Sequence, residues 1–135
     1  MNRVLLFALA MLSGGTPVRS VLAQTAATDT SGVDPCPRAI TQFALTACAD
    51  TIARKADAAL TIEYQKVMAT LSPARRRLLR DAERRWIAYR AAECRYVASE
   101  YEGGSMYPMQ QLFCLAAMTN ARRDELHQQA VDEQK

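Results

Sequence analysis

Apolar residues in the first half of the chain recur at steps of three and four. The recurring positions are Leu45, Cys48, Ile52, Ala56, Leu60, Tyr64, Val67 and Leu71. This spacing places them on one face of an α-helix. Thr41 can cap the start of the helix, and Ser72-Pro73 ends it. The pattern therefore predicts a first helix of about 30 residues.

Two further helices follow from the same spacing. The second starts at Ser72-Pro73 and reaches about Glu100, where Gly103 and Gly104 stop it. Its stripe is Leu79, Ala82, Trp86, Tyr89, Glu93 and Val97. The third starts near Pro108, and its stripe is Leu112, Leu115, Met118, Arg122 and Leu126. No segment has the period of a strand. The prediction is an all-α fold, a three-helix bundle made of a long helical hairpin with a third helix packed on it. Disulfides are expected to link its parts.

The two ends of the chain differ in character from its middle. Residues 1–23 combine Arg3, a short apolar run and small residues before Gln24, which predicts a signal peptide and export to the periplasm or beyond. The apolar run is too short for a membrane span. Residues 24–35 are small and polar and are interpreted as a flexible leader. The helical domain is expected over 36–126, followed by a polar C-terminal tail, 127–135, that should fray.

Charge narrows the choice of partners. The whole chain has 17 basic and 14 acidic residues. Signal cleavage would remove Arg3 and Arg19, which leaves a net charge of +1. A nearly neutral domain gives no reason to expect nucleic acid as a partner. The Arg-rich start of the second helix is interleaved with Asp81 and Glu83, so it is interpreted as a solvated face.

Four cysteines, Cys36, Cys48, Cys94 and Cys114, lie in the predicted domain. An even number in a short exported chain predicts two disulfides, and their wide spacing with a single histidine, His127, argues against a metal site. Helical rise places Cys48, Cys94 and Cys114 at one end of the bundle. Two pairings stay open, Cys36–Cys94 with Cys48–Cys114, or Cys48–Cys94 with Cys36–Cys114. The first is preferred because it would tie the third helix to the first.

The stretch "WIAYRAAEC", from Trp86 to Cys94, is the densest group of chemically distinctive side chains. It lacks the nucleophile and oriented base that catalysis would need, so no enzyme activity and no cofactor are predicted. Buried charges are normally paired. We therefore interpret it as a structural brace, in which Arg90 or Arg122 pairs with Glu93 between helices above a buried Trp86.

Several segments together resemble a known family. They are "TQFALTAC", "ADAALTIEYQKVM", "LLRDAERRWIAYRAAEC", "YEGGS" and "CLAAMTNARRDEL". Their order and the cysteines resemble the LprI-type lysozyme-inhibitor N-terminal domain family. The resemblance implies a small exported helical domain with disulfides, and a protein partner, with lysozyme as the candidate. The family's namesake is a lipoprotein, whereas this sequence lacks the lipidation cysteine.

Three functions remain to be compared at this point. The resemblance favours an envelope binding protein that inhibits a peptidoglycan hydrolase. The alternatives are an envelope interaction or structural module without inhibitory activity, and a binder of an anionic polymer through the arginine face.

The connection between the second and third helices is the candidate partner loop. It contains Tyr101, Gly103, Gly104, Ser105, Met106 and Tyr107. Glycines suit a tight reversal, but the reversal does not require aromatic residues and methionine, which are enriched in interface cores. The loop is therefore predicted to form the docking edge.

Overall fold

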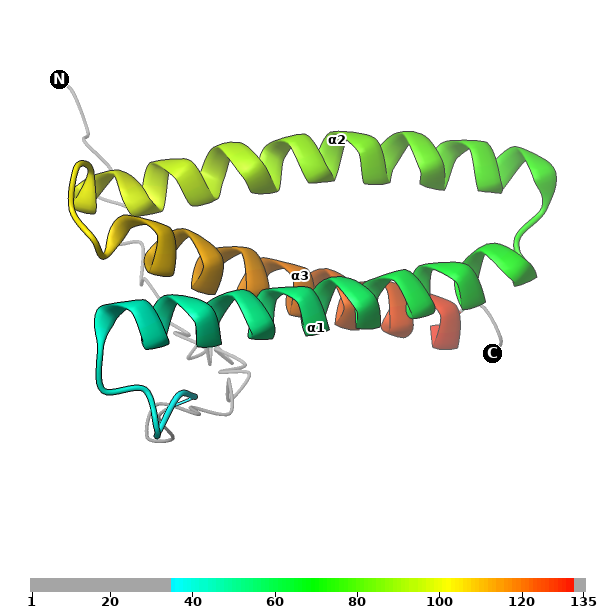
Figure 1. The fold of residues 1–135 in the computed structure, drawn as a ribbon. Coiled ribbons are helices and arrows are strands. Elements are labelled where there is room, and N and C mark those ends of the chain that lie inside the picture. The colour runs from blue at the N-terminus through cyan, green and yellow to red at the C-terminus, as the bar shows by residue number, and fades with distance from the viewer. Residues whose placement is uncertain (1–34, 133–135) are drawn as a thin grey trace, which may run out of the picture. The chain divides into compact units, whose positions relative to one another are not determined.

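The computed structural model describes residues 35–132, and these form three long helices (Figure 1). Helix α1 spans Gln42–Thr70, α2 spans Pro73–Ala98, a 3-10 helix η1 spans Ser99–Tyr101, and α3 spans Tyr107–Asp132. No strand occurs in this part of the chain. The all-α prediction with three helices is confirmed.

The helix starts follow from local sequence. The Thr41 hydroxyl accepts a hydrogen bond from the Ala44 amide at 3.1 Å, and the Ser72 hydroxyl accepts one from the Arg75 amide at 3.4 Å. Pro73 occupies the first turn of α2, where its missing N–H costs nothing. Both predicted caps are therefore present.

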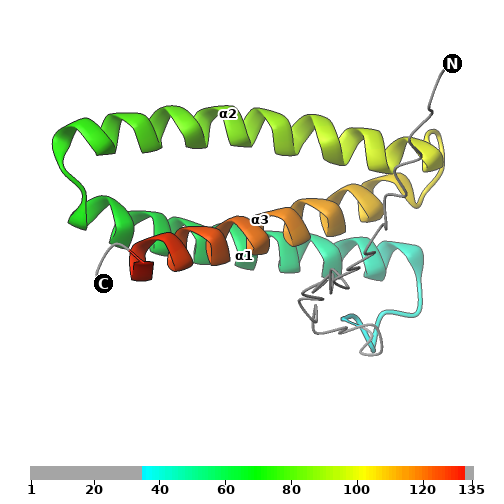
Figure 2. The same ribbon diagram turned by 180° about the vertical axis from the view of Figure 1, so that it is seen from behind.

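Helix α3 packs mainly along α1. The two helices lie side by side in both ribbon views, whereas α2 approaches α3 chiefly near the loop that joins them (Figures 1 and 2). Ala53 and Ala56 of α1 meet Ala116 of α3 in one buried cluster, with Ile52 and Leu112 packed at its edge. Alanine side chains allow two helix backbones to approach closely. The closest helix pair is thus α1 with α3, while α1 and α2 form the predicted long hairpin through the short turn between Thr70 and Pro73.

A second cluster lies toward the α1–α2 turn. Its buried members are Leu60, Val67 and Leu71 of α1 and Leu126 of α3, and α2 contributes the partly buried Leu79 and Trp86. Trp86 therefore packs on the core without being enclosed by it. Leu79 and Trp86 thus reach from α2 to the cluster that α1 and α3 form at this level.

The buried faces match the predicted stripes only in part: Ala56, Leu60 and Val67 of α1 are buried as predicted. On α1 the buried positions include Ala49 and Ala53, one residue after the predicted Cys48 and Ile52. On α2, Tyr89 is exposed although it was placed on the apolar stripe. The buried positions of α2 are Glu83, Cys94 and Ala98. Small and polar residues occupy the interior because α3 approaches α1 closely and because charged pairs lie between the helices.

The ends of the chain complete the description. Helix α3 continues past Leu126 to Asp132, so most of the tail that was expected to fray is helical. The signal peptide and all of the leader except residue 35 lie outside the described residues. Among residues 35–132, no helix has the length and apolar character needed to cross a membrane.

Candidate functional site

Arg90 joins all three helices. Its Nη1 donates to Asp57 Oδ1 on α1 at 2.6 Å and to the Thr119 hydroxyl on α3. The guanidinium also lies 5.0 Å from the centre of the Trp86 ring, a distance at which a cation is attracted to the aromatic face. Arg90 is therefore a brace, as predicted, but its acidic partner is Asp57.

Arg122 makes the second interhelical pair. Its Nε donates to Glu83 Oε1 on α2 at 2.8 Å, and its Nη1 donates to Glu125 at 2.9 Å. Burial acts to lower the pKa of Arg122, but the hydrogen bonds to Glu83 and Glu125 outweigh it, so the pKa lies above its ordinary value. The predicted pairing with Glu93 is wrong. Among the described residues, neither arginine forms an ion pair with Glu93, because the inward face of α2 carries Glu83 and Arg90.

A third polar contact lies nearer the end of α3. His127 Nδ1 is 3.0 Å from Glu63 Oε1 on α1, and Lys66 donates to the other oxygen of the same carboxylate at 3.2 Å. These two hydrogen bonds, with that from His127 the stronger influence, hold the pKa of Glu63 below its ordinary value. The contact was not predicted, since His127 was assigned to the frayed tail.

Both disulfides exist, but neither predicted pairing is correct. The bonds join Cys36 to Cys48 and Cys94 to Cys114, with Cα–Cα distances of 6.1 and 5.4 Å. The arm before α1 folds back beside the first turns of that helix, so Cys36 meets Cys48. Cys94 and Cys114 stand equally far along the chain from Tyr101 and Tyr107, the two ends of the short loop, and therefore face each other.

The predicted partner loop is compact. Gly103 has a positive φ of 75°, which L side chains rarely adopt. A side chain at Gly104 would approach the Tyr101 carbonyl oxygen to 3.2 Å, and the Gly104 amide donates to that oxygen at 2.9 Å. The glycines thus serve the reversal. Tyr101 and Tyr107 are half-buried, which leaves Met106 as the more exposed large side chain of the loop.

Several exposed hydrophobic side chains lie on the other elements at this end of the bundle. The start of α1, the end of α2 and the loop lie at the same end of the bundle (Figure 1). We call this surface the apolar end, and its exposed members are Ile40, Phe43, Tyr96, Val97 and Met106. Phe43 alone is 86% exposed. Such a cluster is typical of a protein-binding surface. Ile40 and Phe43 were not predicted as part of this surface, because they lie far from the loop along the chain.

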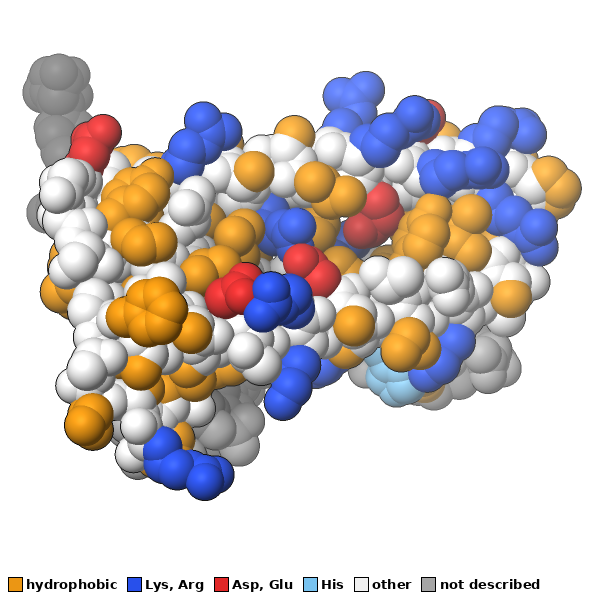
Figure 3. Space-filling model, viewed as in Figure 1, with side chains coloured by type: hydrophobic (Ala, Val, Ile, Leu, Met, Phe, Trp, Pro, Cys, Tyr) orange, Lys and Arg blue, Asp and Glu red, His pale blue; other side chains and the backbone are white. Residues whose placement is uncertain are grey.

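The opposite end has a different character. Six arginines lie on the first half of α2, at positions 75, 76, 77, 80, 84 and 85. In the space-filling view, basic side chains concentrate near the α1–α2 turn, whereas hydrophobic ones are prominent at the apolar end (Figure 3). The near-neutral sum of charges therefore conceals a concentration of basic side chains at one end of the bundle.

The described residues offer little for catalysis. No group of three or more acidic, histidine or cysteine side chains among residues 35–132 could hold a metal ion. All four cysteines are oxidised in disulfides.

Comparison with known proteins gives two matches. Residues 34–126 match the family described as lysozyme inhibitor LprI, which confirms the resemblance. A protein of Rhizobium meliloti (strain 1021), described as uncharacterized, is 36% identical over 104 residues, which cover 67% of this chain and 75% of the relative. No solved structure matches the chain.

Proposed function

The chain belongs to the lysozyme inhibitor LprI family, and from this premise we propose that it is an exported binding protein that inhibits a lysozyme or a related peptidoglycan hydrolase. The two disulfides support an oxidising location outside the cytoplasm, since such bonds are rare in the cytosol.

The apolar end is the surface that we assign to the hydrolase. It combines exposed Phe43 and Met106 from two different elements, and aromatic residues and methionine are enriched in interface cores. The Cys36–Cys48 and Cys94–Cys114 bonds lie under it. A surface that is held in shape before binding loses less conformational entropy when the partner arrives. The exposed apolar surface, braced by the two disulfides, is the single observation that carries the proposal.

In this proposal, long-range electrostatic attraction contributes less to binding than apolar packing does. The arginines lie at the far end of α2, so a cationic lysozyme would be repelled from that end and would meet the apolar end with less repulsion. Charge would then orient the encounter, while apolar packing would supply the affinity.

The test is an inhibition assay with the oxidised protein and a panel of lysozymes, following the clearing of a cell-wall suspension. We expect slower clearing with wild type. A Phe43→Ser, Met106→Ser double variant should melt at the same temperature but inhibit at least about tenfold less, as expected for loss of central apolar contacts.

Leu78→Ser is the matched control. Leu78 is 70% exposed and lies near the start of α2, away from the apolar end. The Leu78→Ser variant should inhibit lysozyme as strongly as wild type does. If wild type slows no lysozyme, the inhibitor proposal is wrong. If the double variant inhibits as well as wild type, inhibition uses another surface.

A further inference from the structure

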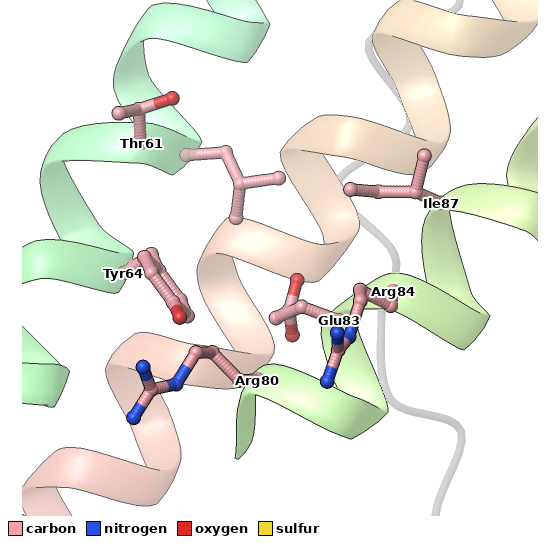
Figure 4. Close-up of a pocket in the computed structure, with 7 residues that line it drawn as sticks. Thr61, Tyr64, Arg80, Glu83, Arg84 and Ile87 are labelled. Atoms are coloured by element: carbon pink, nitrogen blue, oxygen red, sulfur yellow. The ribbon is translucent and has the colours of Figure 1, made fainter. Parts of the chain in front are cut away.

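A pocket lies between α1 and α2, toward the arginine-rich half of α2 and away from the apolar end. Its volume is about 280 Å³, at the small end of the range for ligand sites. Leu60 and Tyr64 of α1 and Ile87 of α2 form its apolar wall, and Arg80, Glu83 and Arg84 form its polar rim (Figure 4). The pocket exists because α3 packs along α1 and leaves this side between α1 and α2 uncovered.

The rim is positively charged on balance. Arg80 makes a single hydrogen bond within residues 35–132, from Nε to the Arg76 carbonyl at 3.4 Å, and has no acidic partner there. Arg84 pairs with Asp81. The acid of the rim, Glu83, is already neutralised by Arg122 at 2.8 Å. One guanidinium therefore faces the pocket mouth without a counter-charge.

Tyr64 adds a second donor beside this charge. In Figure 4 its ring lines the pocket and its hydroxyl points toward the end where the Arg80 guanidinium lies. Within residues 35–132 this hydroxyl makes no hydrogen bond to another residue. The apolar wall of the pocket thus ends at two hydrogen-bond donors, the Tyr64 hydroxyl and the charged Arg80 guanidinium. Neither is paired with an acidic group of the described residues.

We propose that this pocket binds a single-chain anionic amphiphile, a fatty carboxylate. The hydrocarbon chain would lie against Leu60 and Ile87, where burial of apolar surface is favourable. The carboxylate would accept hydrogen bonds from the Arg80 guanidinium, whose planar fork matches its two oxygens, and from the Tyr64 hydroxyl. A cationic amphiphile would meet like charge at the rim. This activity is separate from hydrolase inhibition, because it uses neither the loop nor the apolar end.

The experiment uses the oxidised full chain and sodium decanoate below its micelle concentration. Binding is measured by calorimetry and located by NMR from the methyl shifts of Leu60 and Ile87. We expect saturable binding of decanoate. Decanol and decyltrimethylammonium should bind at least about tenfold more weakly, because they lack the charge that Arg80 pairs with. Acetate should not bind measurably, because it lacks the chain.

Three variants separate the two halves of the site. Arg80→Gln should weaken decanoate about tenfold, the loss expected for one charge-assisted hydrogen bond, and leave decanol unchanged. Tyr64→Phe should weaken decanoate a few-fold, and Ile87→Ser should weaken both ligands. Arg95→Gln, which removes an exposed arginine near the other end of α2, is the matched control and should change neither.

Several results would overturn the proposal. The proposal is wrong if decanoate does not bind, or if decanoate and decanol bind with equal affinity. It is also wrong if the NMR shifts occur away from Leu60 and Ile87. The same holds if Arg95→Gln loses as much affinity for decanoate as Arg80→Gln does. A folding defect in one variant is recognised by its melting temperature, and the ligand comparison on wild type still decides the outcome.

Discussion

Arg122 on α3 and Glu83 on α2 form the most buried ion pair between helices in the described residues, with side chains only 13% and 11% exposed. The Nε–Oε1 distance is 2.8 Å. This pair holds α2 to the α1–α3 pair at a level where α2 has few buried apolar residues of its own.

Glu83→Gln should lower the free energy of unfolding by about 3 kcal/mol, the lower end of the range for breaking a buried pair. The lower end applies because Arg122 keeps its bond to the more exposed Glu125. Glu125→Gln, the matched control, should cost less than about 1 kcal/mol. Urea unfolding of both variants makes the comparison, and equal small losses would show that the buried pair contributes little.

Trp86→Ala should cost about 3 kcal/mol, the lower end for a large aromatic, because the ring is only partly buried. The variant also removes the ring beneath Arg90. Tyr89→Ala, an exposed neighbour on the same helix, should change stability by less than about 0.5 kcal/mol. The midpoints of denaturant unfolding give the stability change of both variants. A Trp86→Ala protein as stable as wild type would contradict its role in packing.

Peptide mapping without reduction should recover Cys36 linked to Cys48 and Cys94 linked to Cys114. A Cys94→Ser, Cys114→Ser double variant should lose about 3 kcal/mol of stability, as expected for a bond that closes a loop of this size. Recovery of a Cys36–Cys94 or Cys48–Cys114 peptide would contradict the structure.

Acid should weaken the contact between α1 and α3 at Glu63. Its pKa is lower in the folded than in the unfolded protein, so the unfolded chain binds more protons and stability rises with pH across this range. The stabilisation that Glu63 contributes is complete at a pH above its pKa in the unfolded chain, which is about 4.3. It disappears as the pH falls through the lower pKa of the folded protein. Glu63→Gln should therefore flatten the pH dependence of the melting temperature in this window.

Glu102→Gln is the control for this measurement. Glu102 lies exposed in the loop after η1, and its replacement should leave the curve unchanged. A Glu63→Gln curve identical to that of wild type would show that the contact does not depend on the charge of Glu63.

Local signals in the sequence were sufficient for the helices. Thr41, Ser72-Pro73 and the pair Gly103-Gly104 mark starts and stops whose effect is confined to a few residues, and each appears where it was expected. The all-α architecture followed from these signals and from the period of the apolar residues.

The contacts between helices could not be obtained in the same way. The height of a residue along a helix is set by its distance from a turn, and this placed three cysteines at one end. Which side of a helix faces which neighbour depends on how the third helix packs. Alanine at position 53 gives a weak hydrophobic signal, yet it determines that α3 approaches α1. The predicted pairing with Glu93 failed for the same reason, because the packing of α2 turns Glu83 toward α3.

The equal distance of Cys94 and Cys114 from the loop was available in the sequence and would have identified that bond. The apolar end was harder to find. Phe43 and Val97 lie far apart in the sequence, and only the packed bundle brings the ends of α1 and α2 together.

The cysteines pair in the order in which they occur along the chain, the first with the second and the third with the fourth. A chain that enters an oxidising compartment with its N-terminus first would therefore present each cysteine to its native partner as soon as that partner arrives. The two bonds also enclose shorter loops than either alternative pairing would, and shorter loops lose less entropy on closure. Oxidation during translocation can then reach the native bonds directly, without a disulfide isomerase to reshuffle them.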